Sequence, residues 1–516
     1  MLKRPVFFAI FLLLAGAAGA AAREPQFAGS FYPAAPAELT AAVDKALAAA
    51  KPYKGKGKVA GILVPHAGYV FSGGVAAHAF ASLKDQYDTV VLLGSAHAEG
   101  FAGAAVMASG HYATPLGKAE VDARLAAALI KKNPFFRDYP RAHARDHNLE
   151  VQIPFLQRRL KKPFRILPVL FGRADEKELE AAGRALGRLL KGRKVLLLIS
   201  TDLSHYPSSA DARRSDLALL KALEKMDPAY FRLAHSLLAS KKPEGLETPA
   251  CGSSAVEAGL HALREVGAAR FDLLGYSDSH REYPAGSPET RVVGYGSGVF
   301  LAGAGPASFS PSPSREQKKE LLRLARRAVE RAFDGTGRHS PQSVPGVIRP
   351  AETPPAPPAP PALPVLADDP FLNLPAGVFV TLNKSGALRG CIGNVSPSYT
   401  LRDAVVRNAL SAAFEDRRFE PLSADELPLV RFEISLLSPL ELAAGHDEVK
   451  PGVHGVAISK KGKSGLFLPQ VWGQLPSKEV FLGELCEQKA GLPRDCWKDK
   501  TTEFYLFTSE SFEELR

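Results

Sequence analysis

From residue 58 to residue 301, short apolar runs alternate with longer stretches of helical periodicity. The run Leu196–Ile199 contains only apolar residues, as a strand covered on both faces requires. Strands that alternate with helices at this spacing favour a mostly parallel sheet with helices on both faces, so the sequence predicts an α/β fold here. The expected strands are 58–64, 89–93, 164–170, 194–199, 271–274 and 292–300, and the expected helices are 37–50, 73–83, 121–131, 175–191, 211–224 and 251–266.

The rest of the chain has a different composition and a different pattern. Residues 303–314 are rich in Gly, Ala, Ser and Pro, which is typical of an interdomain linker. A charged amphipathic helix is expected over 315–333, and the Pro- and Ala-rich residues 350–364 are expected to form an extended insertion. Helix patterns at 400–414 and 479–490 then mix with strand patterns at 430–437 and 453–459. We therefore predict a smaller α+β domain over 315–516, preceded by the α/β domain over 23–302.

The N-terminal residues 1–22 are typical of a secretory signal peptide. A short basic start precedes an apolar run that ends at Ala18, and small residues continue to Ala22. We expect cleavage after Ala20 or Ala22, export to the bacterial periplasm and no stable membrane span in the mature protein. An uncleaved anchor is the alternative, because the run and its small-residue tail are close to the minimum spanning length.

Charge and cysteine content narrow the class of protein. The net charge is +11, but Lys and Arg are scattered and form no basic stripe interleaved with aromatic residues, which argues against nucleic-acid binding. The four cysteines form no CxxC pair. Export would permit a disulfide between Cys486 and Cys496, but their nearness in sequence leaves the pairing open.

Histidines and an aspartate follow three of the predicted strands. His66 and His97 come after the first and second strands, and Asp202 and His205 come after the fourth. If these strands are parallel, their carboxyl ends share the edge of the sheet where ligands bind in open α/β folds. A single histidine is more often a hydrogen-bonded structural residue, whereas convergence from three strand ends favours a site.

Cys251 adds a thiol at the expected start of a helix, a position that favours the thiolate. Two imidazoles and a thiolate suit a transition metal of borderline softness, and Asp202 beside His205 would suit general acid–base catalysis. A buried, inert thiol is the structural alternative. His147 and Glu150 are further candidates, because they would share one face if that stretch were helical.

Six short motifs occur in an order that resembles the Memo family. They are Pro-His-Ala-Gly-Tyr at 65–69, Gly-Ser-Ala-His at 94–97, Thr-Pro-Leu-Gly at 114–117, Asp-His-Asn-Leu-Glu at 146–150, Ser-Thr-Asp-Leu-Ser-His at 200–205 and Cys-Gly at 251–252. The resemblance covers about residues 26–301. It implies a fold like that of the protocatechuate-type extradiol dioxygenases and a bound iron or copper ion.

The resemblance also implies roles for individual residues. The matches to the family's metal ligands are His66, His97 and Cys251, those to its other pocket residues are Asp202 and His205, and His147 lies in a further motif. The family commonly has Gly-Pro-Ser-His-His where this chain has Gly-Ser-Ala-His-Ala at 94–98. Dioxygenases of this fold use a carboxylate as the third ligand, and Cys251 takes that place. Dioxygenase activity therefore does not follow from the fold.

The second half resembles the AMMECR family. The hallmark hexapeptide is present as Leu-Arg-Gly-Cys-Ile-Gly at 388–393, and further family motifs follow at 414–419, 453–456 and 465–470. The glycines around Cys391, next to Arg389, would let the backbone approach a ligand closely, while a structural turn with a buried cysteine is the alternative. Memo-like, AMMECR-like and radical-SAM proteins form the AmmeMemoRadiSam system. This chain resembles the first two fused, which implies a separate radical-SAM partner.

These expectations combine into one leading hypothesis. The chain is expected to be an exported metal-binding protein that acts as a metal-dependent, dioxygenase-like oxidoreductase on a small molecule. The competing hypothesis is a metal-binding protein or interaction scaffold without turnover.

Overall fold

The computed structural model describes residues 22–84, 87–241, 243–303, 313–334, 369–395 and 397–515. Almost all of the predicted signal peptide, most of the predicted linker and the whole Pro- and Ala-rich insertion lie outside the described residues. No helix of the described chain is both long enough and apolar enough to cross a membrane.

The first part of the chain is built on an eight-stranded sheet with the strand order β10-β11-β2-β9-β3-β8-β4-β7. The strands are β2 (Lys58–Val64), β3 (Thr89–Ser95), β4 (Ala104–Val106), β7 (Phe136–Asp138), β8 (Arg165–Phe171), β9 (Val195–Ser200), β10 (Ala268–Asp278) and β11 (Gly294–Ala302). Its centre, β2-β9-β3-β8, is parallel. The β10–β11 and β4–β8 pairs are antiparallel. The predicted α/β fold with a mostly parallel sheet is confirmed.

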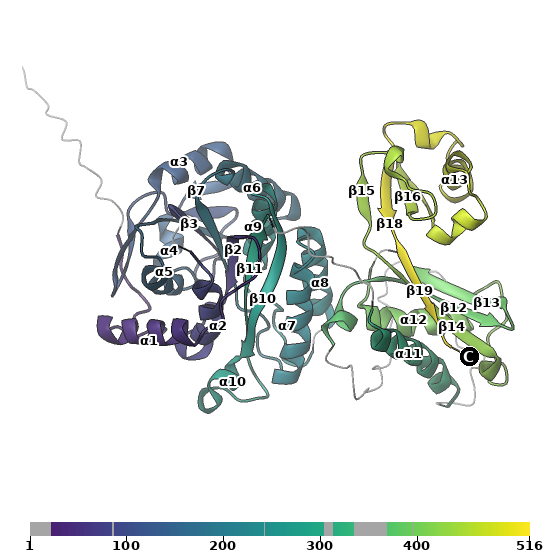
Figure 1. Cartoon of the computed structure of the whole chain (residues 1–516), viewed down its shortest axis with the longest axis horizontal. Coiled ribbons are helices and arrows are strands. Elements are labelled where there is room, and N and C mark those ends of the chain that lie inside the picture. The colour runs from purple at the N-terminus through teal and green to yellow at the C-terminus, as the bar shows by residue number, and fades with distance from the viewer. Residues whose placement is uncertain are drawn as a thin grey trace, which may run out of the picture. The chain divides into compact units, whose positions relative to one another are not determined.

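Helices surround this sheet, as Figure 1 shows. They are α1 (Pro36–Ala49), α2 (Tyr69–Ala81), α3 (Ala123–Lys132), α4 (Pro140–Ala144), α5 (Ile153–Arg159), α6 (Glu176–Leu190), α7 (Ser209–Leu223), α8 (Pro228–Lys241), α9 (Ser253–Glu265) and α10 (Ser279–Glu282). Every residue of β9 is buried, as its apolar sequence predicts. Helix α6 packs closely on α9 because Gly183 has no side chain. A Cβ at this position would lie 2.4 Å from the Ala258 carbonyl oxygen, too close for the two helices to keep their distance.

Several elements were not expected from the sequence. The short strands β4 and β7 extend the sheet, and a separate three-stranded sheet contains β1 (Ala22–Arg23), β5 (His111–Thr114) and β6 (Gly117–Glu120). Helices α4, α5 and α8 were also missed. Strands of two to four residues carry too little period-two pattern to stand out in a sequence.

The second part of the chain has two four-stranded antiparallel sheets, with the orders β13-β12-β14-β19 and β15-β18-β16-β17. The strands are β12 (Gly377–Lys384), β13 (Ala387–Asn394), β14 (Val430–Leu437), β15 (Glu441–Ala443), β16 (Gly455–Lys460), β17 (Lys463–Phe467), β18 (Glu503–Phe507) and β19 (Ser509–Glu513). Helices α11 (Arg315–Asp334) and α12 (Leu401–Phe414) pack on the first sheet. The predicted α+β architecture is confirmed.

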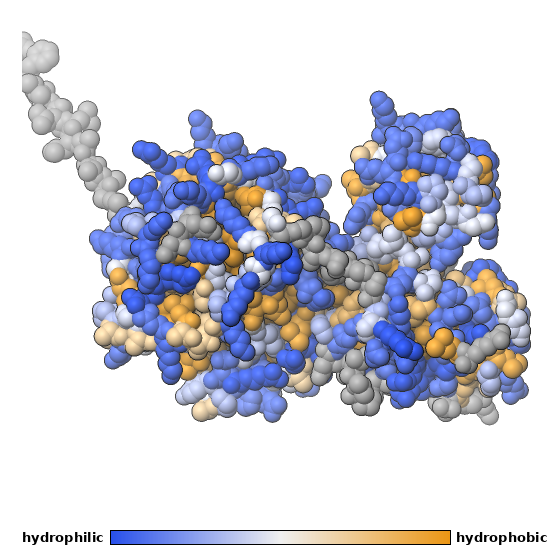
Figure 2. Space-filling view, in the orientation of Figure 1, coloured by the Kyte–Doolittle hydropathy of each residue, from blue (hydrophilic) through white to orange (hydrophobic). Residues whose placement is uncertain are grey.

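A predicted helix and a cysteine pairing that the sequence left open, both in the C-terminal region, have a definite outcome. The helix expected over 479–490 is α13 (Lys478–Glu484) followed by a π-helical turn over Leu485–Lys489. Cys486 and Cys496 form a disulfide, with their Cα atoms 5.9 Å apart, whereas Cys251 and Cys391 keep reduced thiols. Figure 2 shows hydrophilic residues over most of the visible face of each part, with smaller apolar patches among these hydrophilic residues.

Candidate metal centre

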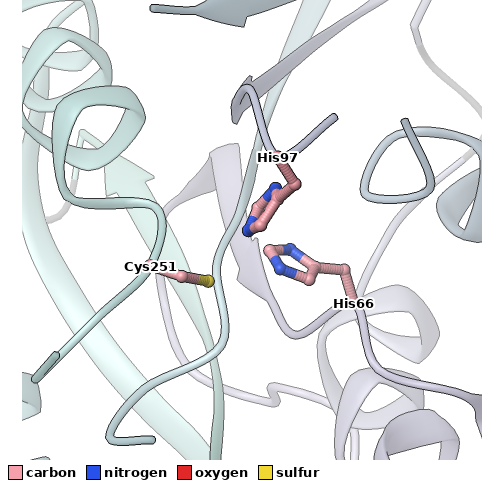
Figure 3. Close-up of side chains that lie close together, drawn as sticks. All are labelled: His66, His97 and Cys251. Carbon is pink, nitrogen blue, oxygen red and sulfur yellow. The ribbon is translucent and has the colours of Figure 1, made fainter. Parts of the chain in front are cut away.

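The structure brings His66, His97 and Cys251 together. Each offers one ligand atom, and these atoms all lie within 4.8 Å of one another. Figure 3 shows both imidazole rings and the thiol pointing toward a common centre. His66 follows β2, His97 follows β3 and Cys251 precedes α9. Because β2, β9 and β3 are parallel, their carboxyl ends lie on one edge of the sheet, as the sequence predicted.

Ser200, at the end of β9, sets the tautomer of the His66 ring. The Ser200 hydroxyl donates to the Asn148 carbonyl oxygen at 2.9 Å and accepts from Gln152 Nε2 at 3.1 Å. His66 Nδ1 lies 2.9 Å from the same hydroxyl oxygen. A hydroxyl has one proton, so Ser200 can only accept from His66, and His66 Nδ1 carries the hydrogen. The ring is therefore in the tautomer that places its lone pair on Nε2, which is the nitrogen a metal would take.

His97 is held by the polar loop that precedes α5. Its backbone N–H donates to Asp146 Oδ2 at 2.7 Å, and its Nδ1 lies 3.1 Å from Asn148 Nδ2 and 4.0 Å from Asp146 Oδ1. Asn148 Nδ2 also donates to the Ser95 carbonyl oxygen at 2.5 Å. Gly94 makes room for this amide, since a Cβ there would lie 2.4 Å from Asn148 Oδ1. The glycine of the second motif is thus needed for the support of His97.

Cys251 lies two residues before α9, so the helix begins slightly later than predicted. Its backbone N–H and its thiol both face the Asp202 carbonyl oxygen, at 3.3 and 3.6 Å. Asp202 is buried, and burial raises the pKa of Tyr295, with a further contribution from the Asp202 carboxylate. His205 Nδ1 lies 2.8 Å from the Leu203 carbonyl oxygen. Among the described residues, the close group of ligand atoms contains neither Asp202 nor His205.

His147 borders the centre, whereas Glu150 does not. The His147 ring lies 5.3 Å from that of His66 and 5.2 Å from that of His97, centroid to centroid. Burial, and to a smaller extent a charge on nearby His97, lowers the pKa of His147 to about 4. The expected shared helical face does not form, because the 3-10 turn begins at Glu150 and the carboxylate binds Arg23 instead.

The hexapeptide around Cys391 lies in β13. Arg389 makes a two-point ion pair with Glu426, at 3.2 and 2.9 Å, and Cys391 Sγ accepts from the Thr381 hydroxyl at 3.3 Å. A Cβ at Gly390 would lie 2.2 Å from the Ala412 carbonyl oxygen. This glycine therefore allows β13 to pack closely on α12, and the close approach of the backbone to a ligand stays a prediction. The turn proposed as the alternative is a strand.

The donor set fits one transition-metal ion. Typical bonds of about 2.1 Å to nitrogen and 2.3 Å to sulfur place tetrahedral ligand atoms about 3.5 Å apart, so the three groups need only a small contraction. Imidazole and thiolate ligands suit iron, copper and zinc. The supporting groups Ser200 and Asn148 were not predicted as site residues. Asn148 lies in the fourth Memo-like motif, which was the only sequence signal for it.

Comparison with known proteins decides the family. Residues 23–299 match the family model described as Memo-like protein. The chain belongs to the Memo family. Residues 322–512 of this Memo-family chain match the model described as AMMECR1, so the predicted fusion is confirmed.

Relatives of both halves are known. A MEMO1 family protein of Methanococcoides burtonii is 36% identical over 276 residues, which is 53% of this chain and 97% of the relative. One from Aquifex aeolicus is 33% identical over 281 residues, which is 54% of this chain and 99% of the relative. Protein PH0010 of Pyrococcus horikoshii is 40% identical over 207 residues, which is 38% of this chain and 88% of the relative.

Two solved structures are similar to parts of the chain. The crystal structure of PH0010 has a TM-score of 0.31 at 38% identity and covers 39% of this chain and 93% of its own. That of protein JW3007 from Escherichia coli K12 also has a TM-score of 0.31, at 13% identity, and covers 46% of this chain and 99% of its own.

Proposed function

We propose that the Memo-like domain binds one redox-active metal ion, iron or copper, through His66, His97 and Cys251, and catalyses the oxidation of a small molecule by dioxygen. The observation that carries this proposal is the convergence of the three ligand atoms to within 4.8 Å of one another. When bound, the ion supplies redox and Lewis-acid chemistry at the edge of the sheet.

The chain's own residues then have distinct tasks. Ser200 keeps the hydrogen of His66 on Nδ1, and Asn148 orients the His97 ring. Asp202 and His205 follow the same strand end and would hold or move protons of the substrate. The AMMECR-like domain, with Arg389 and Cys391 on an outer strand of its sheet, would bind the substrate or a partner such as a separate radical-SAM protein.

A second candidate is metal binding without turnover. The observation that favours it is Cys251, because a thiolate takes the place of the carboxylate that dioxygenases of this fold use. Thiolate ligands suit a carrier that must retain a soft ion such as Cu(I). Either function would be exerted outside the cytoplasm if the predicted signal peptide is cleaved.

Metal analysis of the purified protein tests the site. We expect about one iron or copper ion per chain, and we expect its loss in His66→Ala and in Cys251→Ser. Cys391→Ser is the matched control, because it removes the other reduced thiol and should leave the metal content unchanged. Full metal occupancy in both ligand variants would refute the assignment.

Oxygen consumption separates the two candidate functions. The metal-loaded protein would be screened with catechols and other small oxidisable compounds in an oxygen electrode. Substrate-dependent consumption that disappears in His66→Ala supports the oxidoreductase. Stoichiometric metal without any consumption supports the carrier.

A further inference from the structure

Arg23 is a buried arginine at the beginning of the described chain, only 5% exposed. Its backbone pairs with that of Tyr112 in β5, and its guanidinium carbon lies 4.7 Å from the centroid of the Tyr112 ring. Burying a guanidinium is costly unless its donors are paired. The groups that pair with the Arg23 guanidinium therefore show which part of the structure this arginine holds in place.

All three nitrogens of the guanidinium reach one short segment, residues 143–150, which runs from the end of α4 to the 3-10 turn at Glu150 and is called the loop 143–150 below. Nε donates to the His143 carbonyl oxygen at 2.6 Å, and Nη2 donates to the Asp146 carbonyl oxygen at 2.7 Å. Nη1 donates to the Glu150 carboxylate. Arg23 thus joins the beginning, the middle and the end of residues 143–150. A planar guanidinium is suited to this task, because its donors have a fixed geometry.

The loop held in this way is the one that supports His97. The Asp146 side chain accepts the His97 backbone N–H, while the Asp146 backbone carbonyl accepts from Arg23. Asn148 contacts His97 Nδ1, and the His147 ring lies beside both candidate histidine ligands. A movement of this loop would therefore move a proposed metal ligand directly.

Glu150 ties the N-terminal segment to the same loop. Its carboxylate accepts from the backbone N–H groups of Gln26 and Phe27 at 3.1 and 2.9 Å, and from the Tyr32 hydroxyl. The rings of Phe27 and of Phe31, in the same segment, lie 5.6 and 4.7 Å from the His147 ring. The N-terminal segment therefore contacts His147, the histidine that borders the candidate metal centre.

We propose that Arg23 is a positioning residue of the metal centre, which sets the metal affinity by fixing the loop 143–150 behind His97. The inference rests on the metal site proposed above. The proposal also constrains where the predicted signal peptide can be cleaved. Cleavage after Ala20 or Ala22 leaves Arg23 in the mature chain. A mature chain that begins at Gln26 would contain all three ligands and still bind metal weakly.

Metal affinity of the full chain tests this proposal. The dissociation constant for Cu(I) or Fe(II) would be measured by competition with a chromogenic chelator. We expect Arg23→Ala to weaken binding by about 10- to 100-fold, the range found when groups that support metal ligands are removed. Guanidinium at millimolar concentration should restore part of the affinity. Hydrogen exchange should become faster in residues 143–150.

The matched control is Arg158→Ala, which removes an ion pair with Asp44 between α5 and α1. It should lower the melting temperature without changing metal affinity. An unchanged dissociation constant in folded Arg23→Ala overturns the positioning role. If that variant does not fold, Arg23→Lys decides, because lysine keeps the charge but lacks the planar fork, and parent-like affinity in it overturns the proposal. Absence of stoichiometric metal in the parent chain refutes the proposed function instead.

Discussion

Asp216, a fully buried carboxyl group on α7, should make the stability of the Memo-like domain depend on pH. Burial raises the pKa of Asp216 to about 7, against the opposing effect of hydrogen bonds from the Ser204 N–H at 2.9 Å and the Tyr276 hydroxyl at 3.0 Å. The carboxylate of Asp278 makes a smaller contribution to the same rise in pKa. The group therefore holds its proton in the folded chain at a pH where the unfolded chain has released it.

The size of the effect follows from the two pKa values. Below about pH 3 both states are protonated, and the free energy of unfolding is at its highest with respect to this group. As the pH rises from the ordinary value of 3.8 toward about 7, the unfolded state loses its proton first. The free energy of unfolding then falls by about 1.4 kcal/mol for each pH unit, or about 4 kcal/mol in all. Above pH 7 the loss is complete.

Asp216→Asn should remove this dependence, because an amide keeps the shape and the acceptor for Ser204 but does not titrate. The Asp216→Asn variant should lie within about 1 kcal/mol of the parent near pH 4 and exceed it by about 4 kcal/mol at pH 8. Urea unfolding would be followed by pulse proteolysis, with peptides from α7 quantified by mass spectrometry. Trp472 and Trp497 are the only tryptophans of the sequence, so tryptophan fluorescence follows the second domain as an internal control.

A second control is Asp425→Asn, which makes the same replacement at an exposed position of the second domain and should leave the unfolding reported by the α7 peptides as in the parent. A stability difference between Asp216→Asn and the parent that stays constant from pH 4 to pH 8 would refute the reasoning, because burial would then not be holding the proton.

Three further predictions concern the metal centre and export. Ser200→Ala should weaken metal binding by about tenfold or more, because His66 Nδ1 loses its acceptor; chelator competition measures this, and an unchanged affinity contradicts the tautomer argument. Gly94→Ala should also weaken binding, because the new Cβ would displace Asn148; a crystal structure with Asn148 unmoved would show the reasoning to be wrong. N-terminal sequencing of periplasmic protein should find a chain that begins at Ala21 or Arg23, and an intact Met1 would contradict the predicted cleavage.

The fold could be predicted well where a periodic pattern was long. The strand expected over 58–64 is β2 to the residue, and the apolar run within β9 is buried on both faces. The short strands β4 and β7 could not be predicted, because three residues do not establish a period. Their place in the sheet depends on pairing with residues distant in the chain, such as β4 with β8.

The site was partly predictable for the same reason. His66 and His97 each end a strand with a clear pattern, so the topology of a parallel sheet predicted that they would meet. Glu150 was expected to share a face with His147. Its carboxylate instead pairs with Arg23, which is 127 positions away and could not be recognised as its partner from the sequence. A partner so far away in the chain is found only when the tertiary structure is known.

The sequence by itself determined the α/β and α+β parts, the family motifs and the identity of the three candidate ligands. These depend on local residue order, which sets periodicity and residue chemistry at each strand end. Only the tertiary structure decided which atoms support the ligands. The hydrogen on His66 Nδ1 depends on Ser200, and the placement of His97 depends on Asp146 and Asn148, both in a loop that Arg23 holds. These contacts join residues dozens of positions apart, so their geometry is fixed by packing rather than by spacing along the chain.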